Sequence, residues 1–320
     1  MEFGIISLGN HATTKIIPAI IDSGNKIGAI YSSNRAKGEQ ISEDLGAEFF
    51  DDIDKLLKYD LDAVYISSPN FLHYHYASKA LKSGKDVLLE KPMTLKVQES
   101  IDLVNVSESE GRKLAIGFHL RFHPGIQKIK EILNSSDIGH IIAVYGKWTH
   151  LSSHSLPSDS WWGIPEQAGG GSIVGTGVHV LDSFVNILGK DILSVMGKNH
   201  PSCKVIEDTF SINVMFSNGI IANSLSSRKI PSTNNDLVIY GDNSVLKLTN
   251  AYDTKVKSIL LKDEKEIGKY DSKYDMYLSE IKDFSGKSEY IANGRDGVIS
   301  TKLHLLSQES SCKGKELKFQ

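Results

Sequence analysis

Cysteine is scarce in this sequence: Cys203 and Cys312 are its only two, and they lie in separate segments. Two isolated cysteines make neither a disulfide framework nor a four-ligand zinc site. The net charge is -3, so there is no basic excess to attract nucleic acid or an anionic membrane. No apolar run approaches the roughly 20 residues that span a bilayer, and the first residues lack the basic start of a signal peptide. We therefore expect a soluble, cytoplasmic protein in a reducing compartment, without a metal site, a nucleic-acid partner or a membrane partner.

The first third of the chain alternates apolar strands with helical patterns. Strands are expected at 3–8, 26–31, 63–67, 86–89 and 114–118, with helices between them at 13–21, 35–45, 71–81 and 97–110. Strand–helix–strand units of these lengths predict parallel pairing through right-handed crossovers, with loops gathered at the carboxyl ends of the strands. Residues 1–120 are therefore predicted to form a doubly wound α/β domain of the Rossmann type.

The pattern changes after about residue 120. Helices are expected at 125–133, from the glycine run 169–171 to 188, at 274–284 and at 297–310. Strands are expected at 141–148, 210–216, 220–226, 236–240, 245–248 and 257–261. The short spacing of the later strands suits tight antiparallel turns. Residues 121–320 are predicted to form an α+β domain with an open, mostly antiparallel sheet.

The turn after the first strand has part of a dinucleotide-binding fingerprint. Gly9 and Ala12 stand at two of its three small-residue positions, while Ser7 replaces the first glycine. An ordinary strand-to-helix turn would read the same way, but its place in the first βαβ unit favours a pyrophosphate site. Asn10 and His11 belong to this predicted cofactor-binding loop.

The second strand ends without the carboxylate that usually holds the ribose hydroxyl of NAD. The residues there are Ser32, Ser33, Asn34 and Arg35. Hydroxyl groups and an arginine suit a 2′-phosphate, so we predict that NADP is preferred to NAD. The alternative is that Arg35 merely begins a solvated helix.

Several motifs resemble the glucose–fructose oxidoreductase, inositol dehydrogenase and rhizopine-catabolism family (Gfo/Idh/MocA). They are Asp62–His73, which contains Ser68-Pro69-Asn70, then Gly84–Pro92, which ends in Glu90-Lys91-Pro92, then Gly117–Pro124, Gly169–Gly171, Gly177–His179 and Asp182. The Glu-Lys-Pro element is the most specific of them. The resemblance covers nearly the whole chain and implies a nicotinamide-dependent enzyme that acts on a sugar or polyol, assembled as a homodimer or homotetramer through its second sheet.

The resemblance also implies roles for individual residues. Ser68, Pro69, Asn70 and His73 would line the cofactor cleft, and Glu90, Lys91 and Arg121 would touch the cofactor or its surroundings, with His119 on the substrate side. Other interpretations remain open: Pro69 and Asn70 as a turn, His73 as an ordinary first-turn helix residue, and Arg121 as part of an interdomain salt bridge.

Lys91 is the main catalytic candidate on physical grounds as well. It follows a parallel strand, at the edge where such sheets bind ligands, and Pro92 favours an extended backbone before it. A lysine there can hydrogen-bond a reacting oxygen and stabilise its negative charge, and partial burial would lower its pKa. The alternative is a surface lysine at a strand end.

His179 is the second catalytic candidate. Relatives carry Asp-x-Gly-x-His here, whereas this chain has Gly175 in place of the aspartate. Helical spacing can place Asp182 beside His179, and the missing carboxylate leaves room for a bulkier substrate or for Thr176 to supply a hydroxyl. His179 as a satisfied interdomain histidine is the alternative.

Trp161 and Trp162 suit stacking against a sugar or packing in the interdomain seam. Two further functions also fit the family: a glycoside hydrolase that oxidises its sugar transiently, and a non-catalytic ligand sensor. Cys203 and Cys312 are given no functional role.

Overall fold

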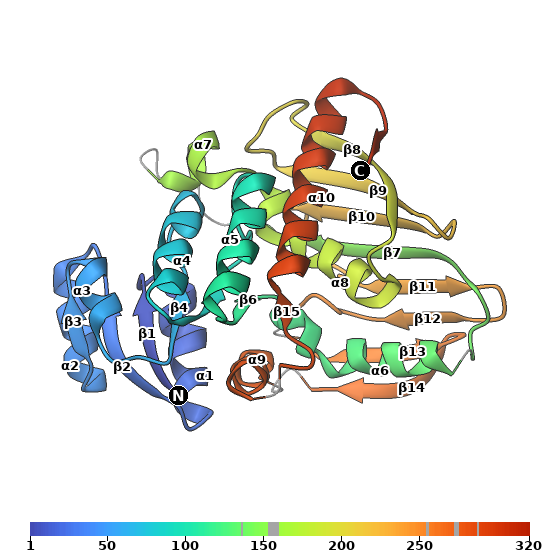
Figure 1. The fold of residues 1–320 in the computed structure, drawn as a ribbon. Coiled ribbons are helices and arrows are strands. Elements are labelled where there is room, and N and C mark those ends of the chain that lie inside the picture. The colour runs from blue at the N-terminus through green and yellow to red at the C-terminus, as the bar shows by residue number, and fades with distance from the viewer. Residues whose placement is uncertain (136, 153–159, 254–255, 272–274, 287) are drawn as a thin grey trace. The chain divides into compact units, whose positions relative to one another are not determined.

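The computed structural model describes residues 1–135, 137–152, 160–253, 256–271, 275–286 and 288–320 (Figure 1). It divides into two compact units: unit 1 is Met1–His119 with Asp275–Thr301, and unit 2 is Leu120–Tyr274 with Lys302–Gln320. We expected one boundary, between residues 120 and 121. A boundary falls one residue earlier, between His119 and Leu120, but the chain returns to unit 1 near its end, so 121–320 is not one continuous domain. The return was not predicted because it depends on tertiary packing.

Unit 1 is built on a seven-stranded sheet in the order β15-β6-β5-β4-β1-β2-β3. The strands are β1 (Glu2–Ile6), β2 (Lys26–Tyr31), β3 (Glu48–Phe50), β4 (Ala63–Ile66), β5 (Asp86–Leu89), β6 (Leu114–Ile116) and β15 (Ala292–Asn293). Neighbours pair in parallel except β15, which runs antiparallel to β6. The strand order reverses between β1 and β4, and this is where doubly wound sheets bind ligands.

Helices cover both faces of this sheet. They are α1 (Ile17–Asp22), α2 (Arg35–Leu45), α3 (Ile53–Lys58), α4 (His73–Lys82), α5 (Val97–Glu110) and α9 (Met276–Ser285). The crossovers from β1 to β2 and from β4 to β5 run in opposite directions, so right-handedness puts α1 and α4 on opposite faces. The buried runs of β1, β4 and β5 form the core between these layers. The predicted Rossmann fold is confirmed, while the short elements β3 and α3 were not anticipated.

Unit 2 contains a nine-stranded sheet in the order β14-β13-β12-β11-β7-β10-β9-β8-β16. Its strands are β7 (Ile141–Thr149), β8 (Ile192–His200), β9 (Thr209–Phe216), β10 (Ile221–Ser227), β11 (Leu237–Gly241), β12 (Val245–Leu248), β13 (Ser258–Lys262), β14 (Lys265–Tyr270) and β16 (Leu317–Lys318). Only β7 and β10 pair in parallel among the strands described. The predicted mostly antiparallel sheet is confirmed, although β8, β14 and β16 were not predicted.

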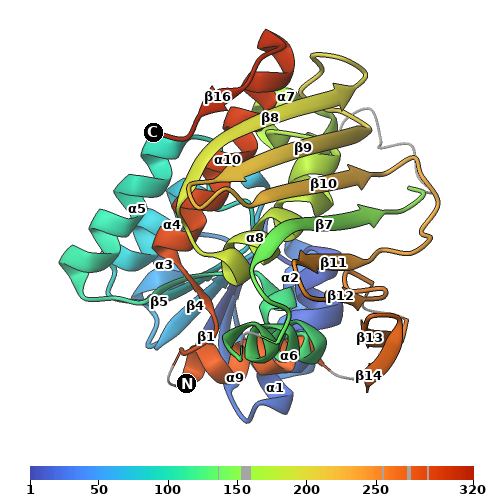
Figure 2. The ribbon, with the colours of Figure 1, turned by 90° about the vertical axis from the view of Figure 1, so that its right-hand side faces the viewer.

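The helices of unit 2 lie on one face of its sheet (Figures 1 and 2). They are α6 (Pro124–Asn134), the short α7 (Pro165–Ala168), α8 (Val178–Leu188) and the second half of α10 (Gly294–Lys313). The stretch Pro165–Leu188 is long and apolar enough to cross a membrane by composition, which the search for apolar runs missed, but 78% of its apolar window is buried inside the protein. A buried core helix accounts for that composition. The predicted helix start at Tyr274 lies outside the described residues.

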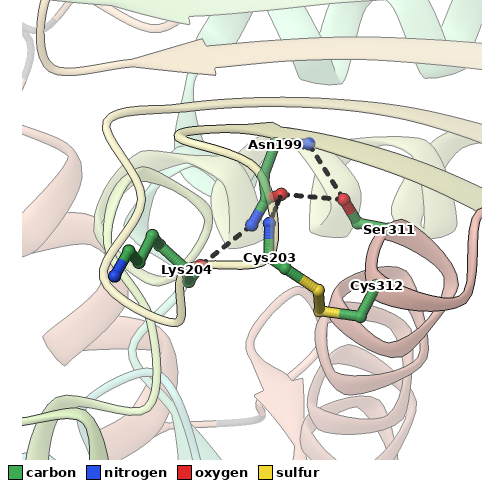
Figure 3. The surroundings of a disulfide bond; sticks show 5 residues. All are labelled: Asn199, Cys203, Lys204, Ser311 and Cys312. Atoms are coloured by element: carbon green, nitrogen blue, oxygen red, sulfur yellow. Dashed lines mark hydrogen bonds between the residues drawn. A yellow bond between two sulfur atoms is a disulfide. The ribbon is translucent and has the colours of Figure 1, made fainter.

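The two cysteines come together in unit 2 (Figure 3), contrary to our expectation of two isolated thiols. Cys203 and Cys312 form a disulfide with their Cα atoms 4.9 Å apart, although 109 residues separate them in the sequence. Beside the disulfide, the Asn199 side chain accepts hydrogen bonds from the Cys203 N–H and the Ser311 hydroxyl. The disulfide therefore ties the loop after β8 to the end of α10, a pairing that separation in sequence conceals.

Candidate active-site residues

The loop after β1 keeps the shape of a dinucleotide-binding turn. Ser7 adopts a left-handed backbone with φ of 79°, so it holds the conformation that glycine usually supplies. Its N–H donates to the carbonyl of Tyr31 at 2.9 Å, which ties the loop to β2. A Cβ added to Gly9 would come no closer than 4.0 Å to a described atom outside its own neighbourhood, so the turn is open beside Gly9. Exposed Asn10 and half-buried His11 follow in the same loop, which fits a pyrophosphate.

The residues at the end of β2 are largely engaged in local contacts. The Ser32 hydroxyl accepts from the Asn34 N–H, and the Asn34 side chain caps α2 by accepting from the Lys37 N–H. Arg35 is 65% exposed and pairs with Glu39 and Asp51 at 2.8 and 2.7 Å. Ser33 is exposed.

Lys37 adds a cation that sequence analysis missed. Its ammonium group donates to the carbonyl of Leu8 at 2.6 Å, so it lies directly against the dinucleotide-binding turn. In the sequence, only its position two residues after Arg35 could have indicated that Lys37 lies near the cofactor-binding loop.

The loop after β4 is tied to the loop that carries Lys91. His73 is buried, and its two ring nitrogens lie 2.9 Å from the carbonyl of Ser68 and 2.7 Å from that of Pro92. Burial lowers the pKa of His73, while the two carbonyls oppose that shift. Pro69 precedes a 3-10 turn in which Asn70 is buried. His73 lies in the first turn of α4, and through these two contacts it links the loop after β4 to the loop that carries Lys91.

Lys91 follows β5 and forms a cis peptide bond with Pro92. Burial lowers the pKa of Lys91, and the adjacent Glu90 carboxylate opposes that shift. Glu90 accepts a hydrogen bond from the Tyr65 hydroxyl at 2.9 Å and lies 3.3 Å from a ring nitrogen of His11. Burial alone would raise the pKa of Glu90, but His11, Lys91 and Tyr65 together lower it to about 2. The Glu90 carboxylate therefore stays charged at physiological pH, beside a lysine whose pKa is lowered by burial.

His119 is the last of the predicted site residues in unit 1. It is buried against Tyr277 of α9, with ring centroids 4.5 Å apart and 3.4 Å between the Tyr277 hydroxyl and the ring nitrogen Nε2. Burial lowers the pKa of His119 to about 3, so the ring is neutral at physiological pH. Tyr277 also makes an edge contact with His11. The place of Tyr277 beside these residues could not be predicted, because nothing in the sequence indicates that α9 returns to unit 1.

In unit 2 a buried ion pair involves one of the predicted residues. Arg121 donates to both carboxylate oxygens of Asp182, at 2.9 and 2.6 Å, and both side chains are buried. The planar guanidinium matches the geometry of the carboxylate, so the pair is bidentate. The salt bridge considered for Arg121 exists, but within unit 2.

His179 lies in α8 and is buried beside Trp148, with ring centroids 5.3 Å apart. Thr176 lies in the π-helical turn Ile173–Gly177 just before α8, and its hydroxyl donates to the carbonyl of Ser172. A side chain at Gly175 would begin in open space, with no described atom within 4 Å. Room therefore exists at the position where the resemblance to the family implies an aspartate.

Trp161 and Trp162 stack on each other in a 3-10 turn, with ring centroids 4.2 Å apart and an interplanar angle of 26°. Both rings are partly exposed. Mutual stacking leaves one further ring face to each tryptophan, which fits either interpretation of the pair. In the part of the chain that the structure describes, no cluster of three His, Cys, Asp or Glu side chains is arranged to hold a metal ion.

A doubly wound unit with a half-buried lysine after β5, followed by an α+β unit with one open sheet face, is the architecture of a two-domain dinucleotide-binding protein. Residues 1–118 match the family model described as the GFO/IDH/MocA oxidoreductase family with an NAD-binding Rossmann fold. Residues 126–247 match the model of the family's C-terminal domain. The chain belongs to this family, as the motifs predict.

Individual proteins are also similar to this chain in sequence or in fold. Oxidoreductase P35 of Formosa agariphila is 31% identical over 229 residues, which cover 69% of this chain and 70% of that protein. A D-xylose 1-dehydrogenase (NADP(+)) of Haloferax volcanii is 32% identical over 193 residues, or 59% and 58% of the two chains. Two further relatives are matched over only 42% and 53% of their lengths. The aldose–aldose oxidoreductase of Caulobacter crescentus shares the fold over 100% of this chain and 99% of its own, with a TM-score of 0.88 at 20% identity.

Proposed function

We propose that this protein is a nicotinamide-dependent oxidoreductase that interconverts a hydroxyl and a carbonyl group on a sugar, sugar derivative or polyol. The observation that carries the proposal is Lys91, whose pKa is lowered by burial at the carboxyl end of β5 in a dinucleotide-binding unit. Membership of the family and the sugar named for the Haloferax relative support the substrate class. When bound, the dinucleotide supplies or accepts the hydride.

The side chains of this chain handle binding and protons. Lys91 hydrogen-bonds the reacting oxygen, stabilises its negative charge and exchanges a proton with it. Glu90 keeps a negative charge beside Lys91 and so limits the fall of its pKa. His179 is the second proton-transfer group. The open space at Gly175 leaves it without the aspartate of its relatives and admits a larger substrate.

The test is a panel of sugars, sugar acids and polyols, assayed for a change in NADPH or NADH absorbance. We expect turnover on at least one member, and a loss of about 10³-fold in kcat for Lys91→Ala. Lys96→Ala, which removes an exposed lysine of the same unit, is the matched control and should keep normal kcat.

Near-normal turnover of Lys91→Ala would disprove the catalytic assignment. No turnover on any member would favour a ligand sensor. Cleavage of a glycoside without net NADH release, together with cofactor that survives purification, would favour the hydrolase.

We propose NADP as the preferred cofactor. The support is the absence of a carboxylate at the end of β2, the cation of Lys37 against the turn, and Arg35 nearby. The ion pairs of Arg35 are exposed and therefore cost little to exchange for a phosphate. We expect Arg35→Ala and Lys37→Ala each to lower kcat/KM for NADP about tenfold and to leave the value for NAD unchanged. Lys82→Ala is the control, and equal efficiency of the wild type with NAD would contradict the proposal.

We propose a homodimer or homotetramer that associates through the uncovered face of the unit 2 sheet. An apolar row crosses four adjacent strands on that face: Tyr240 and Ile221, which are 43% and 41% exposed, with Ala143 between them and Met215 beside Ile221. Light scattering after gel filtration should show a smaller particle for Ile221→Lys. Ile21→Lys, on an exposed position of unit 1, should not change the mass.

We also propose a cytoplasmic location, supported by the cofactor class. In that compartment Cys203 and Cys312 would be kept mainly as thiols. Cell fractionation with a thiol-trapping reagent tests both points, and recovery of the protein outside the cytoplasm would reject the location.

A further inference from the structure

One buried carboxylate of unit 2 has no place in the roles described so far. Glu207 lies in the loop between β8 and β9 and is fully buried. Its Oε2 accepts the N–H of Gly171 at 2.9 Å, and its Oε1 accepts the N–H of Ile173 at 2.6 Å and the Ser172 hydroxyl at 3.2 Å. Its main-chain carbonyl accepts the N–H of Ser172 at 3.1 Å. Four hydrogen bonds thus join one residue to three consecutive residues.

The contact explains part of the glycine run. A Cβ on Gly171 would lie 1.9 Å from the carbonyl oxygen of Glu207 and 2.6 Å from its nitrogen, so only glycine permits this approach. Gly169 ends α7 with a left-handed φ of 76°, which again favours glycine. Gly171 therefore permits the close approach of the Glu207 backbone, and Gly169 permits the turn at the end of α7.

The contact lies at the start of the helical segment with the site residues. The first N–H groups of a helix have no partner inside it, and an anion there is favoured by the helix dipole. Glu207 satisfies two of these groups from a distant loop. The π-helical turn Ile173–Gly177 and α8 follow at once, and they carry Thr176 and His179. A shift at this joint moves both side chains along the helix axis.

Glu207 is itself held on both sides. Asn199, at the end of β8, binds the loop through Cys203 and Lys204 and binds α10 through the Ser311 hydroxyl, and the oxidised pair Cys203–Cys312 adds a covalent link (Figure 3). The next residue, Asp208, pairs with Arg228 of the strand-end region after β10 at 2.8 Å. Because these contacts hold Glu207 in place, its carboxylate can in turn hold the start of the helical segment that it binds.

We propose that Glu207 is a positioning residue for the reaction: it sets the axial position and rotation of the helix that carries Thr176 and His179. This inference rests on the assignment of His179 under the proposed function. A residue that served only to stabilise the fold would lower the melting temperature without a specific loss in kcat.

The experiment compares Glu207→Gln and Glu207→Ala with Asp236→Asn as a matched control. Asp236 is also a buried carboxylate of unit 2; it accepts a backbone N–H from Asn250 at 2.9 Å and pairs with Lys247 at 3.5 Å, both outside this helix. We expect kcat to fall about tenfold for Glu207→Gln and about 10²-fold for Glu207→Ala, since small misplacements have effects of this size. The KM for the cofactor should stay within about twofold. Asp236→Asn should keep normal kcat even where its melting temperature falls.

Gly171→Ala disturbs the same joint from the helix side and should reproduce the loss, which keeps the test decisive if Glu207→Ala does not fold. In a His179→Ala background, Glu207→Gln should cost little further kcat, because the group that it positions is gone. If Glu207→Gln keeps kcat within twofold of the wild type while His179→Ala loses most of its kcat, this inference is overturned and the assignment of His179 stands. Additive losses, or an equal loss for Asp236→Asn, would also overturn it. Normal turnover of His179→Ala would instead remove the assignment of His179, and this inference with it.

Discussion

Lys91 in unit 1 and His179 in unit 2 are held in different ways. Lys91 directly follows β5, and the contacts that fix its surroundings come from neighbouring strand ends of the same parallel sheet, through Glu90, Tyr65 and His73. His179 lies within a helix whose position depends on side chains far away in the chain. Glu207 binds the helix start across 36 residues, and Arg121 binds Asp182 across 61. The fold itself supplies the first arrangement, whereas individual long-range contacts supply the second.

The charges of the two regions differ accordingly. Arg121 and Asp182 form a buried, bidentate ion pair. The Glu90 carboxylate, in contrast, interacts with three side chains, those of His11, Lys91 and Tyr65, at a partly exposed strand end. A buried, bidentate ion pair mainly stabilises the fold, whereas a partly exposed cluster of charged groups, here called the open cluster, can rearrange when a ligand binds. The predictions below test this contrast, starting with the largest effect.

Breaking the buried pair should produce the largest loss of stability. Asp182→Ala leaves the guanidinium of Arg121 buried without its partner, which we expect to lower the free energy of unfolding by about 3–5 kcal/mol, measured by urea denaturation. Asp54→Ala removes an exposed ion pair with Lys79 and should cause no measurable change.

The double variant Arg121→Met with Asp182→Leu separates the possible roles of Arg121. We expect it to regain most of the lost stability, because no buried charge is then left unpaired. Regained stability with normal kcat would show a purely structural pair. Regained stability without activity would show that Arg121 also serves the reaction, as the resemblance implies.

The disulfide should come second. Cys203→Ser opens a link across 109 residues and should lower the free energy of unfolding of the air-oxidised protein by about 3 kcal/mol. A reductant should destabilise the wild type by a similar amount and leave Cys203→Ser unchanged, which makes the variant its own control. A wild-type protein indifferent to reductant would show that the two thiols do not pair in solution.

The same contrast explains what could be predicted from the sequence. The Rossmann fold, the strand ends and the motif around Lys91 were predictable because strand, turn and helix signals are local. The elements α2, α5, β2 and β5 match their expected bounds within a residue.

What escaped prediction depends on contacts between distant segments. The return of α9 to unit 1, the role of Tyr277, the Arg121–Asp182 pair and the cysteine pairing all bring together residues that no local pattern links. Glu207 gave no signal, because a single carboxylate between two strands reads as an ordinary loop residue. The glycine run was visible as a motif, but its cause lies in the backbone that approaches it.

The smallest effect should come from the open cluster of unit 1. Tyr65→Phe removes one hydrogen bond to the Glu90 carboxylate and should lower the free energy of unfolding by about 1.5 kcal/mol at neutral pH. The pKa of Glu90 is lowered from its usual 4.5 to about 2 in the folded protein, so the stability that its charge contributes is present above about pH 4.5 and is lost as the pH falls towards 2. The difference between Tyr65→Phe and the wild type should therefore shrink over that interval. Tyr59→Phe, at a partly exposed tyrosine, should show no such dependence. A Tyr65→Phe deficit that stays constant down to pH 2 would mean that the hydroxyl stabilises packing and not the charge beside Lys91.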